Sequence, residues 1–185
     1  MLIIVLARDS RKIFRLFKSL NEFNQIYSKI YGDIIWQQRK LPHVLDFFSR
    51  LGFFFYWIFD NIQILANIKF INADPQFHLK LASWGWTIGI LFGIARNVLD
   101  LLDLLKKKQA ESALGEKEKK QETSQLDFLI LKTLVDISGK LGDLIVASNG
   151  AGIAQKLFGK SFSEGTLAIG GLYAALVSLW NHYLK

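Results

Sequence analysis

The chain has no cysteine, two prolines and three histidines in 185 residues. Without cysteine, disulfide scaffolds, thiolate zinc sites and cysteine nucleophiles are excluded. The scarcity of proline, together with the apolar composition, argues against a collagen-like or disordered polymer. The histidines, His43, His78 and His182, lie far apart without the spacing of helical metal ligands, so we expect neither a metal site nor a histidine base.

The chain is instead both apolar and basic. Hydrophobic residues make up 51% and aromatic residues 14%, and 23 Lys and Arg against 16 Asp and Glu give a net charge of +7. These two excesses together favour an anionic lipid surface as the partner. We do not expect nucleic acid to be a partner, because no zinc-finger, RNA-recognition or helix-turn-helix signature is present.

Residues 10–35 have the periodicity of a basic amphipathic helix, with apolar residues every three or four positions. Arg11, Arg15 and Lys18 fall on the opposite side and are predicted to bind lipid head groups. A soluble helix with a solvated charged face is the alternative. The residues predicted to insert into a membrane are Ile13, Leu16, Phe17, Leu20, Phe23 and Tyr27.

Two further helices are predicted at residues 41–71 and 77–108. The first is rich in aromatic residues, which fits either a membrane boundary or the core of a soluble bundle. The second contains 15 uncharged residues, fewer than the roughly 20 that span a bilayer core, so it could span, be half inserted or be buried. Gly85, Gly89 and Gly93 form two overlapping Gly-x-x-x-Gly units, which predict close packing against a neighbouring helix.

Charged residues 109–124 predict a solvated linker between an N-terminal unit, residues 1–108, and C-terminal helices, residues 125–185. A helix is predicted at 126–146, and residues 147–164 are predicted to be loops. The helix has one stripe of alternating charge, which indicates a solvated face. This stripe consists of Lys132, Asp136, Lys140 and Asp143.

Residues 165–181 carry no charge over about 25 Å of helix, which makes them the best candidate for a transmembrane helix. Gly170 and Ala174 contribute to a small-residue face that is predicted to pack against another helix. Taken together, the segments predict an all-α, membrane-associated protein with a basic amphipathic helix and one to three membrane-embedded helices.

No group of residues assembles a catalytic site, so we expect neither enzyme activity nor a cofactor. Residues 154–161 loosely follow the letters of a phosphate-binding loop. However, Ala154 replaces the first glycine of that motif, and helices are predicted on both sides where the motif needs a strand before it.

Four stretches are distinctive in combination. They are Ser10-Arg-Lys-Ile-Phe-Arg-Leu-Phe-Lys-Ser-Leu-Asn-Glu-Phe23, Phe55-Tyr-Trp-Ile-Phe-Asp-Asn-Ile62, residues 89–102, and the small-residue C-terminal helix that ends in Leu179-Trp180. With these stretches the chain resembles the peroxin 11 family, the membrane-elongating proteins of peroxisomes. Members of that family usually carry a longer stretch before the first motif, so we expect this chain to be either a shortened paralogue or an incomplete sequence.

The resemblance implies a protein of the peroxisomal membrane that drives elongation before division, self-associates, and recruits a dynamin-related GTPase through fission adaptors. The residues are compatible with this role, because helix 10–35 would bury its apolar face in one leaflet of an anionic phospholipid membrane and so favour curvature. The family's other ascribed activity, a pore for small metabolites, is the alternative, with Arg96, Asp100 and Asp103 as candidate lining residues. A soluble helical bundle is a third possibility.

Overall fold

The computed structural model describes residues 18–31, 41–112 and 119–183, and every regular element in these ranges is a helix. The all-α expectation is therefore confirmed for the described residues. The helices are α2 (Lys18–Tyr31), α4 (Leu41–Asn67), α5 (Pro75–Ser112), α6 (Lys119–Gly150), α7 (Ile153–Phe158) and α8 (Glu164–Tyr183).

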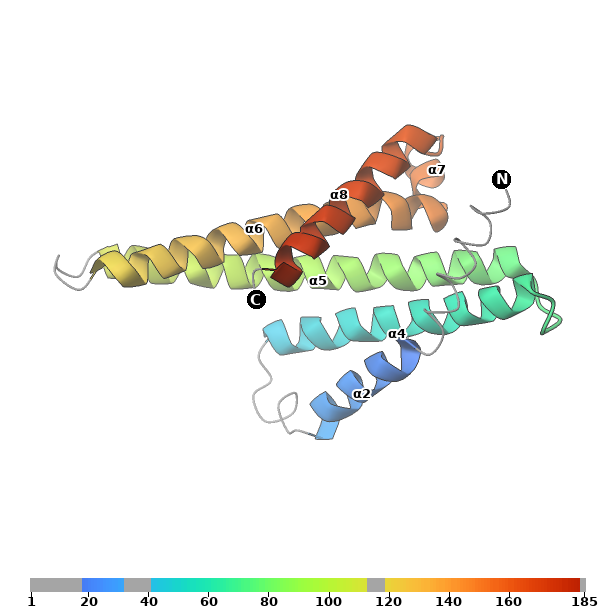
Figure 1. Cartoon of the computed structure of the whole chain (residues 1–185), viewed down its shortest axis with the longest axis horizontal. Helices are drawn as coiled ribbons and strands as arrows, with labels where there is room; N and C mark the ends of the chain where they lie inside the picture. The colour runs from blue at the N-terminus through green and yellow to red at the C-terminus, as the bar shows by residue number, and fades with distance from the viewer. Residues whose placement is uncertain (1–17, 32–40, 113–118, 184–185) are drawn as a thin grey trace.

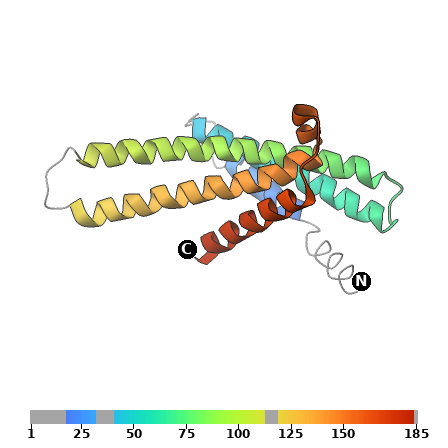
Figure 2. The same cartoon turned by 90° about the horizontal axis from the view of Figure 1, so that it is seen from above.

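The helices form an elongated assembly in which each long helix packs on its neighbour (Figure 1). The long helix α5 lies between α4 and α6, α2 packs on the other side of α4, and α8 crosses α6. Seen from above, α5 and α6 run side by side for most of their length (Figure 2). Few large side chains are fully buried in this arrangement, and Ile90 is the largest of them among the described residues.

Local sequence explains where the chain turns between helices. Lys69 adopts a left-handed backbone, with φ of 58°, in the turn that joins α4 to α5. Asp74 then caps α5 by accepting a hydrogen bond of 2.9 Å from the backbone N–H of Gln76, and Pro75 occupies the first helical position, where its missing N–H costs nothing. The short helix α7 lies between two left-handed glycines, Gly152 and Gly159.

Helices α4 and α5 cross at glycines that bring their backbones into contact. A Cβ atom added to Gly52 would lie 2.5 Å from the backbone nitrogen of Gly89, and one added to Gly85 would lie 2.8 Å from that of Tyr56. The Ser49 hydroxyl donates a buried hydrogen bond of 2.7 Å to the Gly89 carbonyl at the same crossing. Backbones this close leave no room for side chains between them, so the larger residues of both helices project to the sides.

Helices α6 and α8 cross in the same way. A Cβ on Gly142 would lie 2.7 Å from the Gly170 carbonyl oxygen, and one on Gly139 would lie 2.6 Å from a methyl group of Val177. Gly170, Ala174 and Val177 are the buried residues of α8. The bulky side chains of this helix point outward instead, and the exposed ones include Ile169, Leu172, Leu176, Leu179, Trp180 and Tyr183.

Several expected boundaries differ from the structure. The predicted linker, 109–124, is shorter, because α5 continues to Ser112 and α6 already begins at Lys119. The predicted loop region, 147–164, contains the end of α6 and the whole of α7. Within the described ranges, no helix combines the length and the apolar character needed to cross a bilayer, so the transmembrane helix expected at 165–181 is not confirmed.

The glycine crossing between α4 and α5 predicts a steric cost for the smallest possible substitution. Gly52→Ala should lower the free energy of unfolding by about 1–3 kcal/mol, because the new methyl group meets backbone atoms of Gly89 that cannot rotate away. Gly171→Ala is the matched control, since its Cβ would meet nothing closer than 3.8 Å and alanine favours helix by up to about 1 kcal/mol. Urea unfolding followed by circular dichroism measures both. Equal midpoints for Gly52→Ala and the parent would contradict the close crossing.

Candidate membrane-contacting surface

Helix α2 is attached to α4 through its charged side. Glu22 pairs with Arg50 at 3.4 Å, and the Lys18 ammonium lies 4.8 Å from the centre of the Trp57 ring. Ile26 is buried on the same side. Lys18, which was predicted to lie on a free polar side of the helix, therefore contacts another helix, as does Glu22.

The apolar flank of α2 remains exposed. Leu20, Phe23 and Tyr27 are 59%, 50% and 50% exposed, respectively. The Phe23 ring stacks on Tyr27 at 6.3 Å and also lies 6.1 Å from the Phe54 ring of α4, which holds this flank against the edge of α4. An amphipathic helix usually buries its apolar stripe in the protein, so this exposed flank is available to an apolar environment outside the molecule.

The structure describes part of the predicted lipid-contacting set. Lys18 is exposed, and its ammonium extends over the Trp57 ring. Leu20, Phe23 and Tyr27 share the exposed flank. The other predicted residues lie outside the described ranges, namely Arg11, Ile13, Arg15, Leu16 and Phe17.

The glycines and small residues predicted to pack helices all lie at helix contacts. Gly85 and Gly89 meet α4, while Gly93 faces the Ser49 hydroxyl at 3.1 Å and the Lys140 side chain of α6 at 3.5 Å, as measured from an added Cβ. Gly170 and Ala174 are buried against α6. The partners of these residues are Gly52 on α4 and Gly139 and Gly142 on α6. They could not be recognised in the sequence, because none of the three belongs to a Gly-x-x-x-Gly unit.

Arg96, proposed from sequence as a pore residue, is engaged in ion pairs within the helical layer. Its guanidinium lies 3.0 Å from Asp100 on the next turn of α5 and 3.7 Å from Asp46 of α4. Asp103 is exposed on α5. Arg96 thus links α4 to α5 and compensates two carboxylates.

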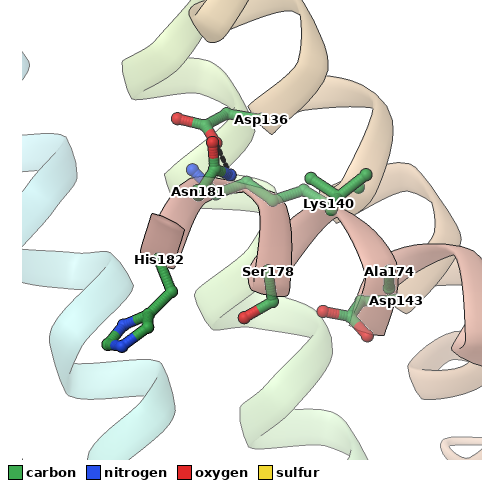
Figure 3. A pocket seen from close by; sticks show the side chains of 9 residues that line it. Asp136, Lys140, Asp143, Ala174, Ser178, Asn181 and His182 are labelled. Atoms are coloured by element: carbon green, nitrogen blue, oxygen red, sulfur yellow. Dashed lines mark hydrogen bonds between the residues drawn. The ribbon is translucent and has the colours of Figure 1, made fainter. Parts of the chain in front are cut away.

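A polar pocket of about 440 Å³ lies between α6 and α8 (Figure 3). At one end Asn181 donates a hydrogen bond to Asp136, at the other Asp143 lies beside Ala174, and His182 points away from both (Figure 3). The Lys140 ammonium reaches the Gly93 carbonyl of α5 at 3.4 Å. The prediction of a solvated stripe is therefore wrong for Asp136, Lys140 and Asp143, which are half-buried and line this pocket.

Burial changes the acidity of two of these groups. Desolvation lowers the pKa of Lys140, although nearby carboxylates, Asp136 first, oppose the change. Desolvation also raises the pKa of Asp143, for which the described part of the chain provides no hydrogen-bond or ion-pair partner. No cluster of metal-ligating side chains occurs among the described residues.

The fold and the surface define a class of protein. It is an all-helical protein that packs small residues inside and presents large apolar side chains outside, as expected for a protein that works at a membrane. The sequence profile of the family described as peroxisomal biogenesis factor 11 (PEX11) matches residues 6–183. The chain therefore belongs to this family, which confirms the resemblance seen in the sequence.

A relative supports the same assignment. The chain is 24% identical, over 199 aligned residues, to the peroxisomal membrane protein 11 homolog of Dictyostelium discoideum, and the alignment covers 96% of this chain and 75% of the relative. No solved structure matches the chain significantly. The protein is thus a peroxisomal membrane protein of a biogenesis-factor family, a family not known for enzymes.

The unpartnered Asp143 predicts a pH-dependent stability. Burial raises the pKa of Asp143 in the folded chain, so protonation of its carboxyl group stabilises the folded state. This stabilisation is complete below the ordinary pKa of 3.8 and is lost as the pH rises through the folded pKa. Asp143→Asn should therefore raise the melting temperature at pH 7 and change it little at pH 3. Asp127→Asn, at an exposed position paired with Lys108, is the control and should show no such gain at pH 7. Equal melting temperatures for Asp143→Asn and the parent at pH 7 would refute the prediction.

Proposed function

We propose that this protein promotes curvature, elongation and division of the peroxisomal membrane. The observation that carries the proposal is the orientation of α2, whose charged side is attached to α4 while Leu20, Phe23 and Tyr27 face outward. When these side chains enter the boundary between head groups and acyl chains, they expand one leaflet relative to the other. A rigid attachment to α4 transmits that insertion to the whole molecule.

The partner in this proposal is an anionic phospholipid membrane. Lys18 remains exposed on α2, and the chain carries a net charge of +7, so negative head groups would be attracted to it. We extend the proposal, on the family resemblance, to self-association and to recruitment of a dynamin-related GTPase through fission adaptors.

The insertion flank can be tested in the full-length chain. Phe23→Ser should weaken binding to vesicles that contain anionic phospholipid by about tenfold or more and abolish their tubulation, because burial of a Phe side chain is worth about 1.5–3 kcal/mol. Binding is measured by vesicle flotation and tubulation by electron microscopy. Asn24→Ser, an exposed polar position on the next residue of α2, is the matched control and should behave as the parent. Full tubulation by Phe23→Ser would overturn the mechanism.

A further inference from the structure

The exposed flank of α2 continues as an apolar face onto α4. The aromatic rings form an unbroken series: Phe23 lies 6.1 Å from Phe54, Phe54 lies 5.7 Å from Phe55, and Phe55 stacks with Phe59 at 6.4 Å. Phe48 and Phe55 are both exposed. The apolar surface is therefore wider than one amphipathic helix.

The charged residues of α4 lie on its other side. Asp46 and Phe55 are nine residues apart, as are Arg50 and Phe59, and nine residues are about two and a half helical turns. Each charged residue thus faces away from its aromatic counterpart. The ion pairs with Glu22 and Arg96 are made on that opposite side.

A groove of about 330 Å³ joins this face to α5. Its base is the glycine crossing at Gly52 and Gly85, and its walls are almost entirely apolar, with Phe55 on one side and Trp84 and Ile88 on the other. The groove exists because the two backbones touch while their aromatic side chains splay apart. Its size is at the lower end of the roughly 300–1,000 Å³ range of small-ligand pockets.

Beyond the groove, the face follows α5 as a stripe with alternating spacings of four and three residues. The stripe consists of Trp84, Ile88, Leu91, Ala95, Val98, Leu102 and Leu105. Its large side chains are between 38% and 50% exposed. Exposed lysines lie at its two ends, Lys80 before Trp84 and Lys106 after Leu105.

We infer that this continuous face of α2, α4 and α5 lies on the acyl chains of one membrane leaflet, with the α4–α5 groove holding a segment of an acyl chain. The inference rests on the proposed function, which supplies the membrane, but it assigns the lipid contact to three helices instead of to α2 alone. Long lysine side chains at both ends of the α5 stripe can reach head groups of the same leaflet while their stems remain in apolar surroundings.

The charges favour a lipid leaflet over a second copy of the chain. If two copies paired through the α5 stripe in parallel, Lys80 would face Lys80 and Lys106 would face Lys106. An antiparallel pair would bring Lys80 against Lys106. Both arrangements place like charges together, which disfavours the complex, whereas anionic head groups compensate every lysine.

The absence of cysteine makes a direct test possible, since one introduced thiol can be labelled uniquely in the full chain. Phe55→Cys, Ile88→Cys and Leu102→Cys variants, labelled with an environment-sensitive nitrobenzoxadiazole dye, should brighten by about twofold or more on addition of phosphatidylcholine–phosphatidylserine vesicles, because the labels enter the acyl boundary. Spin-labelled acyl chains should quench them. Asp103→Cys, next to Leu102 on α5, and Asn21→Cys, on the polar flank of α2, are the controls and should not change.

A Tyr27→Cys label reports on the proposed function separately. If Tyr27 responds but Phe55 and Ile88 do not, α2 inserts alone and the inference is overturned while the proposed function stands. If Phe55 and Ile88 respond but Tyr27 does not, only α4 and α5 enter the leaflet, so the three-helix face is overturned together with the α2 mechanism. If the label responds at none of these positions, both the inference and the proposed function are overturned. Brightening with protein concentration in the absence of vesicles would assign the face to a second copy and also overturn the inference.

Discussion

The contact of backbone against backbone at the α4–α5 crossing determines how the rest of the molecule is arranged. Gly52, Gly85 and Gly89 remove the side chains that would normally separate two helices, and the buried Ser49 hydroxyl adds a hydrogen bond at that point. The aromatic residues of both helices are consequently displaced from the interface to its edges. A glycine contact in the interior and an apolar groove at the surface are therefore two results of the same packing. The α6–α8 crossing repeats this arrangement, with bulky residues on the outer side of α8.

Several charged side chains connect neighbouring helices. Glu22 and Arg50 join α2 to α4, Arg96 joins α4 to α5 through Asp46, and Lys140 reaches from α6 to α5. Salt bridges exposed to water contribute little to stability, but pairs shielded between helices are screened less. These polar contacts orient helices that lack a large apolar interior. Asp143, which has no such partner in the described ranges, shows the desolvation cost of this arrangement in its raised pKa.

The sequence predicted the helices better than their contacts. Periodicity located the long helices, and the spacing of Gly85 and Gly89 indicated a close approach, yet nothing in the aromatic run around Gly52 identified it as the partner. Lys140 and Asp143 were missed as half-buried residues because alternating charges at helical spacing look the same on a solvated face and between helices. The sequence also could not predict the orientation of α2, because Lys18 and Glu22 identify a polar side of the helix without showing which element that side contacts. The uncharged run at 165–181 suggested a membrane span, and its small residues Gly170 and Ala174 lie at the contact with α6, a partner that the run itself did not identify.

In the proposed function, the way α2 is held against α4 is the reason why surface insertion would produce curvature instead of simple adsorption. A helix joined only by a flexible tether would adjust its depth and angle to any leaflet. Here α2 is fixed by an ion pair, a cation–π contact and the buried Ile26, so its depth relative to α4 is set by the protein. A leaflet that accommodates the exposed residues of α2 must then match the shape of the α4–α5 surface beside it. The free energy gained from burying these side chains thereby favours the membrane shape that fits the rigid helices.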